Sequence, residues 1–197
     1  MNELFDNEET IKESIAEVIA ENINNDAKIC DVGFDNTFLI KKLKLKDKSF
    51  FYNGTDIFDD VVESASKYVK ENGLKNCIIE KVPFGAFDKK GFNVCVCVRL
   101  FHHFSKEDTL FFLKKMVDVI DCNGEIYLAD SIRDFNGRED RFSYTPYFYL
   151  NEISKIVGEE RFEIEYSEDT MLNVGEVWIM KLTILKGKCK CKLLKTK

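Results

Sequence analysis

Apolar residues follow two kinds of spacing along this chain, and the two kinds alternate. Between residues 8 and 25, the apolar positions recur every three or four residues, as one face of a helix requires (Ile11, Ile15, Val18, Ile19 and Ile23). Residues 92–98 (FNVCVCV) instead form an almost continuous apolar run. Such runs are typical of a strand that is buried on both faces of a parallel sheet.

Extended along the chain, this pattern predicts helices and strands in turn. The predicted helices span residues 8–25, 38–45, 59–72, 105–119 and 146–157. The predicted strands span residues 28–32, 49–52, 77–79, 92–98, 125–129, 161–166 and 176–185. Alternating strands and helices favour a parallel sheet with right-handed crossovers, whereas the last two strands are joined too closely for a crossover. We therefore expect an α/β fold with a doubly wound, mostly parallel seven-stranded sheet, an antiparallel edge strand and helices on both faces.

Length and composition fit one domain. The chain has 197 residues, of which 45% are hydrophobic, enough to bury a core. We predict a single Rossmann-like domain at residues 1–186 and a basic tail at residues 187–197.

Charge and hydropathy indicate which classes of partner and which location to expect. The net charge is −6 although residues 181–197 contain seven lysines and no acid, so the rest of the chain is strongly acidic. Such a surface is a poor match for nucleic acid, and we expect no nucleic-acid partner. The tail is expected to be solvated, with phosphate or anionic lipid as the alternative contact. No apolar stretch is long enough to span a membrane and the first residues do not resemble a signal peptide, so a cytoplasmic protein is expected. The oligomeric state is left open.

The seven cysteines predict neither a disulfide framework nor a metal site. Five of them lie in strand-like segments or before a turn and are expected to be reduced thiols (Cys30, Cys77, Cys95, Cys97 and Cys122). Cys189 and Cys191 lack the further ligands that zinc needs.

Ligands of doubly wound sheets bind beyond the carboxyl ends of the strands, so three loops are candidates. The first reads Asp31-Val32-Gly33-Phe34-Asp35-Asn36-Thr37, the second Asn53-Gly54-Thr55-Asp56-Ile57, and the third Val98-Arg99-Leu100-Phe101-His102-His103-Phe104. A phosphate-binding Gly-x-x-x-x-Gly-Lys loop is absent from the sequence, and the first loop lacks the glycines of a dehydrogenase.

In this order and spacing, the three loops resemble those of class I S-adenosylmethionine-dependent methyltransferases. Asp31 and Gly33 match the acid and first glycine of the family's acid-x-Gly-x-Gly-x-Gly loop, while Asp35 and Thr37 replace its second and third glycines. The segment 54–57 matches the family's Gly-x-Asp-[Ile/Leu] pattern, and the segment 101–104 is similar to its Leu-His-His run. The resemblance covers about residues 27–185.

The resemblance implies S-adenosylmethionine as cofactor and a small-molecule methyl acceptor. It implies that these residues bind the cofactor: Asp31, Val32, Gly33, Phe34, Asp35, Asp56, Ile57, Val82, Pro83, Arg99 and Leu100. Asp56 would accept the ribose hydroxyls, the alternative being that Asp56 or Asp59 caps the helix at 59–72. Glu80 is the nearest candidate for an acid beside the adenine. Phe84 and Phe87 are candidates for adenine packing, although core packing is the safer expectation.

The two histidines and Arg99 are the candidates for chemistry on the acceptor. His102 or His103 could act as a general base, or both could cap and pack the next helix. Arg99 could bind the cofactor's carboxylate or an acidic substrate, or pair with Asp31 or Asp35. The acceptor is expected to lie among the N-terminal helix, the loop after strand 92–98 and the aromatic segment 130–149.

The altered glycine loop leaves two alternatives to a methyltransferase. One is a binding or scaffold protein that has lost the cofactor, with a side chain such as Asp35 in the cofactor pocket. The other is a non-methylating enzyme of the same fold, such as an aminopropyl transferase or a cofactor-assisted cyclase.

Overall fold

A computed structural model describes residues 2–131, 146–157, 162–169 and 177–185 of the chain. Its helices are α1 (Asn2–Asn22), α2 (Phe38–Leu45), α3 (Asp59–Glu71), α4 (Lys106–Val119) and α5 (Pro146–Val157), with short 3₁₀ turns η1 (Phe84–Ala86) and η2 (Phe101–His103). Its strands are β1 (Ala27–Val32), β2 (Phe50–Asp56), β3 (Cys77–Lys81), β4 (Phe92–Val98), β5 (Ile120–Ser131), β6 (Phe162–Asp169) and β7 (Val177–Ile184). The predicted order of helices and strands is therefore confirmed.

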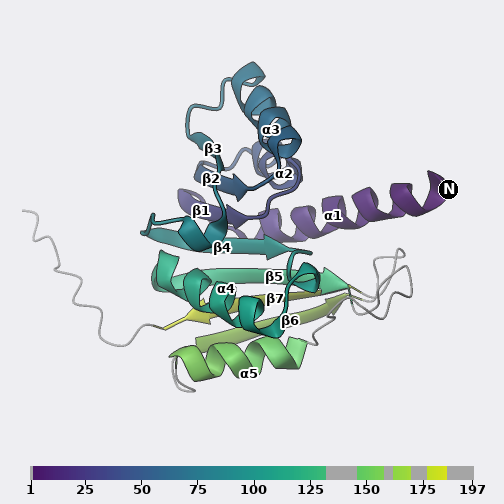
Figure 1. Ribbon diagram of the computed structural model, residues 1–197. Coiled ribbons are helices and arrows are strands. Elements are labelled where there is room, and N and C mark those ends of the chain that lie inside the picture. Colours follow the sequence, from purple (N-terminus) through teal and green to yellow (C-terminus); the bar gives the residue numbers. More distant parts are fainter. Residues whose placement is uncertain (1, 132–145, 158–161, 170–176, 186–197) are drawn as a thin grey trace, which may run out of the picture.

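The described strands form one seven-stranded sheet in the order β3-β2-β1-β4-β5-β7-β6 (Figure 1). Strands β1 to β5 pair in parallel, and β7 pairs antiparallel with both β5 and β6. The predicted α/β fold is confirmed, and the structure locates the antiparallel strand: β7 lies one place inside the sheet, and β6 forms the edge. The strand order reverses between β1 and β4, which places their carboxyl ends side by side.

Period-two alternation along the central strands produces two hydrophobic cores. On β4, Val94 and Val96 face α1 and α2, whereas Cys95 and Cys97 face α4 and α5. The apolar face of α1 that the sequence predicts is buried: Ile11, Ile15 and Ile19 are at most 1% exposed and Val18 is partly buried, while Ile23, fully buried, follows the helix by one residue. Helices therefore cover both faces of the sheet, as predicted.

Four ion pairs join α1 to α2. Lys42 contacts Glu13 and Glu17 at 2.9 and 3.0 Å, and Lys46 contacts Glu17 and Glu21 at 2.5 and 3.1 Å. The two lysines lower the pKa of Glu17 by donating hydrogen bonds to its carboxylate. These pairs lie at the surface, so they orient α1 over the sheet more than they stabilise the fold.

The connection from β3 to β4 contains one 3₁₀ turn, η1, where a doubly wound sheet usually has a helix. Three polar side chains lie near this connection: Lys89 Nζ donates to Asn53 Oδ1 at 3.0 Å and pairs with Glu80, and Asn53 Nδ2 donates to Glu80 Oε2 at 2.7 Å. Glu80 is thus engaged with Asn53 and Lys89. Phe84 and Phe87 are 5% and 2% exposed and belong to the core beneath α4, in agreement with the core-packing alternative.

Cys30, Cys95 and Cys97 are buried and free, and Cys77 is half-buried and free. The prediction of a reduced thiol is wrong for Cys122, which is disulfide-bonded. The basic tail at 187–197 and most of the aromatic segment 130–149 also lie outside them. None of the described helices is long and apolar enough to cross a membrane.

Ser105 is the N-cap of α4, as the sequence predicts. Its Oγ accepts a hydrogen bond from the Asp108 backbone N–H at 3.2 Å and donates one to Asp108 Oδ2 at 2.8 Å.

Replacing the Ser105 hydroxyl leaves the Asp108 backbone N–H without its cap. We expect Ser105→Ala to lower the free energy of unfolding by about 1 kcal/mol in urea titrations. Ser66→Ala, at an exposed position inside α3, should change it by less than about 0.5 kcal/mol. Equal effects of the two variants would contradict the cap.

Candidate functional site

The loop between β1 and α2 has the backbone that a glycine-rich turn requires at two of three positions. Gly33 and Asp35 have φ of +62° and +52°, the left-handed region that aspartate tolerates better than most residues. Thr37 has φ of −98°, so its backbone does not need glycine. The cap of α2 comes from Asn36, whose Oδ1 accepts the Phe38 N–H at 2.8 Å. Of the two residues that stand in place of glycines, only Asp35 therefore adopts a backbone conformation that is unfavourable for a residue with a side chain.

Gly33 lies close against a side chain of the third loop, Leu100. Its N–H donates to the carbonyl of Thr55 at 2.8 Å, which ties the end of β1 to β2. A Cβ on Gly33 would lie 2.8 and 2.9 Å from the two methyl groups of Leu100, in the loop after β4. Leu100 was predicted to bind a cofactor; the structure places it against Gly33.

Gly54 makes room for Phe34 in the same way. A Cβ on Gly54 would lie 2.8 Å from Phe34 Cδ1 and 2.8 Å from Tyr52 Cε1. Phe34 is 6% exposed. The glycine of the second loop thus accommodates the aromatic residue of the first, and both loops pack as a unit at the carboxyl ends of β1 and β2.

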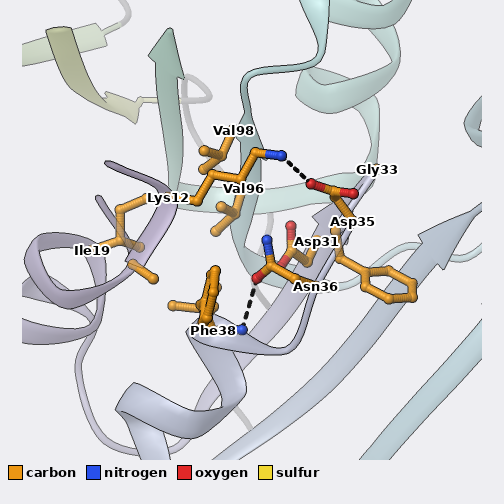
Figure 2. Close-up of a pocket in the computed structure, with 12 residues that line it drawn as sticks. Lys12, Ile19, Asp31, Gly33, Asp35, Asn36, Phe38, Val96 and Val98 are labelled. Atoms are coloured by element: carbon orange, nitrogen blue, oxygen red, sulfur yellow. Dashed lines mark hydrogen bonds and ion pairs between the residues drawn. The ribbon is translucent and has the colours of Figure 1, made fainter. Parts of the chain in front are cut away.

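A hollow opens beside this unit, beneath α1 (Figure 2). Its polar wall comes from Lys12, Asp31, Asp35 and Asn36. Its other walls are formed by these residues: Ala16, Ile19, Gly33, Phe34, Phe38, Leu39, Val96 and Val98. The hollow is partly open to solvent and has a volume of about 30 Å³, room for a water molecule or two. The hollow is therefore shallow, and a larger ligand needs the residues at its mouth to move.

Lys12 and Asp35 form an ion pair at this mouth, the Lys12 amine donating to Asp35 Oδ2 (Figure 2). Lys12 lies on α1, and Asp35 occupies the position of the second glycine in the loop. The side chains are 20% and 51% exposed, so water screens the pair only in part. The sequence pointed to Asp35 but not to Lys12, whose position beside the apolar face of α1 carries no such signal.

Asp31 forms the buried part of the polar wall. It is 5% exposed and its Oδ2 accepts a hydrogen bond from the Tyr52 hydroxyl at 2.7 Å. Burial raises the pKa of Asp31 to about 7, the Tyr52 hydrogen bond opposes this rise, and the nearby Asp56 carboxylate adds to it. Tyr52 is a further site residue that the sequence did not indicate, because the strand pattern predicts it only as core.

Asp56 is the last residue of β2 and is 7% exposed. Its Oδ1 accepts the backbone N–H groups of Ile57 and Phe58 at 2.7 and 3.1 Å, and its Oδ2 accepts that of Asp35 at 3.2 Å. The Ile57 and Phe58 N–H groups both precede α3, which begins at Asp59, so Asp56 does not cap the helix in the way the alternative requires. A carboxylate has about four acceptor positions, so about one remains for a ligand. Asp56 therefore joins the second loop to the first.

The remaining predicted cofactor residues do not line the hollow. Val32 faces the opposite core beneath α4, and Ile57 is 53% exposed beside Asp56. Val82 donates its N–H to the carbonyl of Asp56 at 3.1 Å, and Pro83 follows it at the surface. Arg99 has φ of +52° and donates its N–H to the carbonyl of Ala129 at 2.8 Å. Asp31 contacts Tyr52 and Asp35 contacts Lys12, and among the described residues no ion pair joins Arg99 to either acid, so this one of the alternatives for Arg99 is not formed.

The two histidines lie at the carboxyl ends of β4 and β5. His102 Nδ1 lies 3.4 Å from Asp130 Oδ1, and both side chains are largely buried. The ring of His103 lies with its centroid 3.9 Å from that of His102, and its side chain is exposed. Phe148 and Tyr149 of the aromatic segment pack against each other and against the core, with Tyr149 fully buried, whereas Tyr147 is exposed.

No known family profile matches the chain, and no curated protein matches it in sequence. Solved structures do match it. The magnesium protoporphyrin IX methyltransferase ChlM from Synechocystis PCC 6803, solved with bound SAM, gives a TM-score of 0.65 at 15% identity over 90% of this chain and 80% of that one. The chain has the class I methyltransferase fold.

Two other matches show how widely this fold is used. The [4+2]-cyclase SpnF gives a TM-score of 0.68 at 11% identity over 89% of this chain and 82% of that one. A putative rRNA-methylase from Clostridium thermocellum gives a TM-score of 0.62 at 12% identity, over 86% of this chain and 93% of that one. At such identities the likeness shows the class I methyltransferase fold alone, and the function has to be argued from the site.

The packing of Gly33 against Leu100 is tested by comparison with Gly73, which has φ of +63° and no neighbour within 4 Å of a built Cβ. Both Gly→Ala variants carry the left-handed backbone penalty of about 1 kcal/mol. Only Gly33→Ala must also displace Leu100, so it should cost at least about 1 kcal/mol more in urea unfolding. Equal losses would show that Leu100 does not confine this turn.

Proposed function

We propose that the protein is an S-adenosylmethionine-dependent methyltransferase with a small-molecule acceptor. The observation that carries the proposal is the hollow beneath α1, at the carboxyl ends of β1 and β4, on a fold shared with a methyltransferase solved with bound SAM. Doubly wound sheets bind ligands where the strand order reverses, and this hollow lies at that point.

The charges around the hollow complement the amino-acid end of the cofactor. Asp31 offers a carboxylate to an ammonium group, and Lys12, once released from Asp35, offers an ammonium group to a carboxylate. Asp56 retains acceptor capacity for a ribose hydroxyl, and the exposed Ile57 beside it offers apolar surface to a base. The residues present therefore fit the cofactor, provided that the Lys12–Asp35 pair opens to admit it.

The cofactor would supply an activated methyl group, so the chain itself has to position the acceptor and accept a proton from it where the acceptor carries one. We assign that second role to His102. Asp130 Oδ1 lies 3.4 Å from its Nδ1, close enough to stabilise a protonated imidazole although no hydrogen bond joins the two, and the pair lies at the carboxyl edge of the sheet. His103, exposed and against the His102 ring, would face the acceptor. Arg99 would attract an anionic group of the cofactor or acceptor.

The first test is calorimetric titration with S-adenosylmethionine and S-adenosylhomocysteine. We expect micromolar binding that Asp56→Ala weakens ten-fold or more, about 1.4 kcal/mol, because the ribose loses its acceptor. Asp60→Ala removes an exposed acid from the adjoining helix α3 and should bind like the wild type. Circular dichroism checks that Asp56→Ala remains folded. Failure of both ligands to bind at millimolar concentration would overturn the proposed function.

A cofactor-free binding protein is the second candidate, and the ion pair at the mouth of the hollow favours it. Asp35 has a side chain where the family's loop has none, and Lys12 holds that side chain across the entrance. A non-methylating enzyme is the third candidate, since SpnF shares the fold. Product analysis with the bound ligand separates methyl transfer from that chemistry.

The substitution Asp35→Gly distinguishes the first two candidates. It relieves a positive φ and removes the ion pair, so a cofactor site should bind S-adenosylmethionine several-fold more tightly. Asp47→Gly relieves a similar φ of +51° far from the hollow in sequence and should leave binding unchanged. A scaffold that has lost the cofactor for other reasons would bind it in neither variant. Unchanged binding in Asp35→Gly would show that the pair does not obstruct the site.

A further inference from the structure

We infer that Asp31 selects ligands by charge: its carboxyl group is neutral in the free protein and ionises when a cationic centre of the ligand enters the hollow. The inference rests on the proposed function and extends it. It makes cofactor binding release a proton, and it assigns Asp31 a role that position in a glycine loop does not by itself imply.

Burial is the first argument. Asp31 is 5% exposed, yet its carboxyl group forms part of a cavity wall whose other sides are mostly apolar. An ionised carboxylate in such surroundings needs a paired cation or several hydrogen bonds. Within the described residues its carboxyl group has one hydrogen bond, from Tyr52, and no ion pair. One neutral donor compensates little of the cost of burying a charge.

The charged neighbours give the second argument. From α1, the group facing the hollow is Lys12, and its amine is engaged by Asp35. From β2 come the Tyr52 hydroxyl and the Asp56 carboxylate, whose negative charge opposes ionisation of Asp31. α2 and β4 contribute apolar side chains to the hollow. Taken together, these neighbours favour the protonated, neutral form of Asp31 until a cation of the ligand enters the hollow.

The remaining titratable neighbours do not change this balance. Cys95 and Cys97 lie on β4 beside β1, and burial raises the pKa of both thiols well above its ordinary value, so they stay neutral near pH 7. The pKa of Asp31 itself, raised to about 7 mainly by burial, agrees with the geometric argument. An entering ammonium or sulfonium group would supply the missing cation.

The expected consequence is an affinity that rises with pH. If only the ionised form binds, about 3% of the protein is competent at pH 5.5 and about half at pH 7.0, so affinity should rise about 15-fold. Below pH 7.0 the amino group of the ligand stays mostly protonated, which keeps its own titration out of the measurement.

The experiment is titration calorimetry of the full chain at pH 5.5 and 7.0, in two buffers of different ionisation enthalpy. The probes are S-adenosylmethionine, S-adenosylhomocysteine and 5′-methylthioadenosine, the last of which lacks the amino-acid group and is uncharged. We expect proton release and a ten-fold or greater rise in affinity for S-adenosylmethionine, but neither for methylthioadenosine. A rise shared by S-adenosylhomocysteine identifies the ammonium as the cation, and a rise confined to S-adenosylmethionine identifies the sulfonium.

Two variants separate Asp31 from other titrating groups. Asp31→Asn keeps an oxygen for the Tyr52 hydroxyl but cannot ionise, so its affinity should not vary with pH. Tyr52→Phe removes the one hydrogen bond to the carboxyl group and should shift the affinity profile to higher pH. Asp60→Asn removes an exposed acid and should behave like the wild type.

Thermal melting of the free protein provides a readout that needs no ligand. A carboxyl group whose pKa is higher in the folded than in the unfolded protein holds extra protons between about pH 4 and pH 7. The contribution of that group to the free energy of unfolding therefore falls as pH rises through this window. The melting temperature of the wild type should fall relative to that of Asp31→Asn between pH 4 and 8.

The outcomes distinguish this inference from the proposed function. Binding of S-adenosylmethionine with the same affinity at both pH values, or with equal pH dependence in Asp31→Asn, overturns the inference and leaves the proposed function standing. Equal pH dependence for methylthioadenosine also overturns it. Absence of binding to all three probes at both pH values overturns both.

Discussion

The parallel pairing of β1 with β2 on one side and with β4 on the other is the constraint on which the candidate site depends. It brings the ends of three strands, distant in sequence, to one place in the sheet. The turn after β1 is then fixed from both sides, by the Gly33 hydrogen bond to Thr55 and by the Leu100 side chain. Because Gly54 admits Phe34, neither loop can be changed alone without disturbing the other.

The sequence predicted the fold well because periodicity reports burial directly. The stripe of α1 and the continuous apolar run of β4 each have one low-energy placement in a two-faced sheet. Strand ends were less predictable: β2 runs to Asp56, four residues beyond its apolar part, because pairing with β1 and β3 continues through Asn53, Gly54 and Thr55. Those polar residues gave no strand signal.

The site was predictable only where its residues lie in a recognisable loop. Asp31, Gly33 and Asp35 were found in this way, and the structure brings them together at the hollow. Lys12 and Tyr52 were missed because their roles arise from contacts across 23 and 21 residues, which no local pattern encodes. Glu80 shows the converse: its place after a strand suggested a ligand contact, but Lys89 and Asn53 engage its carboxylate. Contacts between residues distant in sequence, which no local sequence pattern shows, decide which polar side chains remain available to a ligand.

The short connection between β3 and β4 has a consequence for how the molecule opens. Without a helix there, β3 is only partly buried, with Ile78 39% exposed, and α3 contributes Ala65 as its one buried side chain within the described structure. The strands β4, β5 and β7, in contrast, are covered on both faces. Amide exchange with solvent should therefore be faster at the β2–β3 edge than in β4, β5 and β7. Asp56 ends β2, so a ligand held there would bind beside this less protected edge and order it.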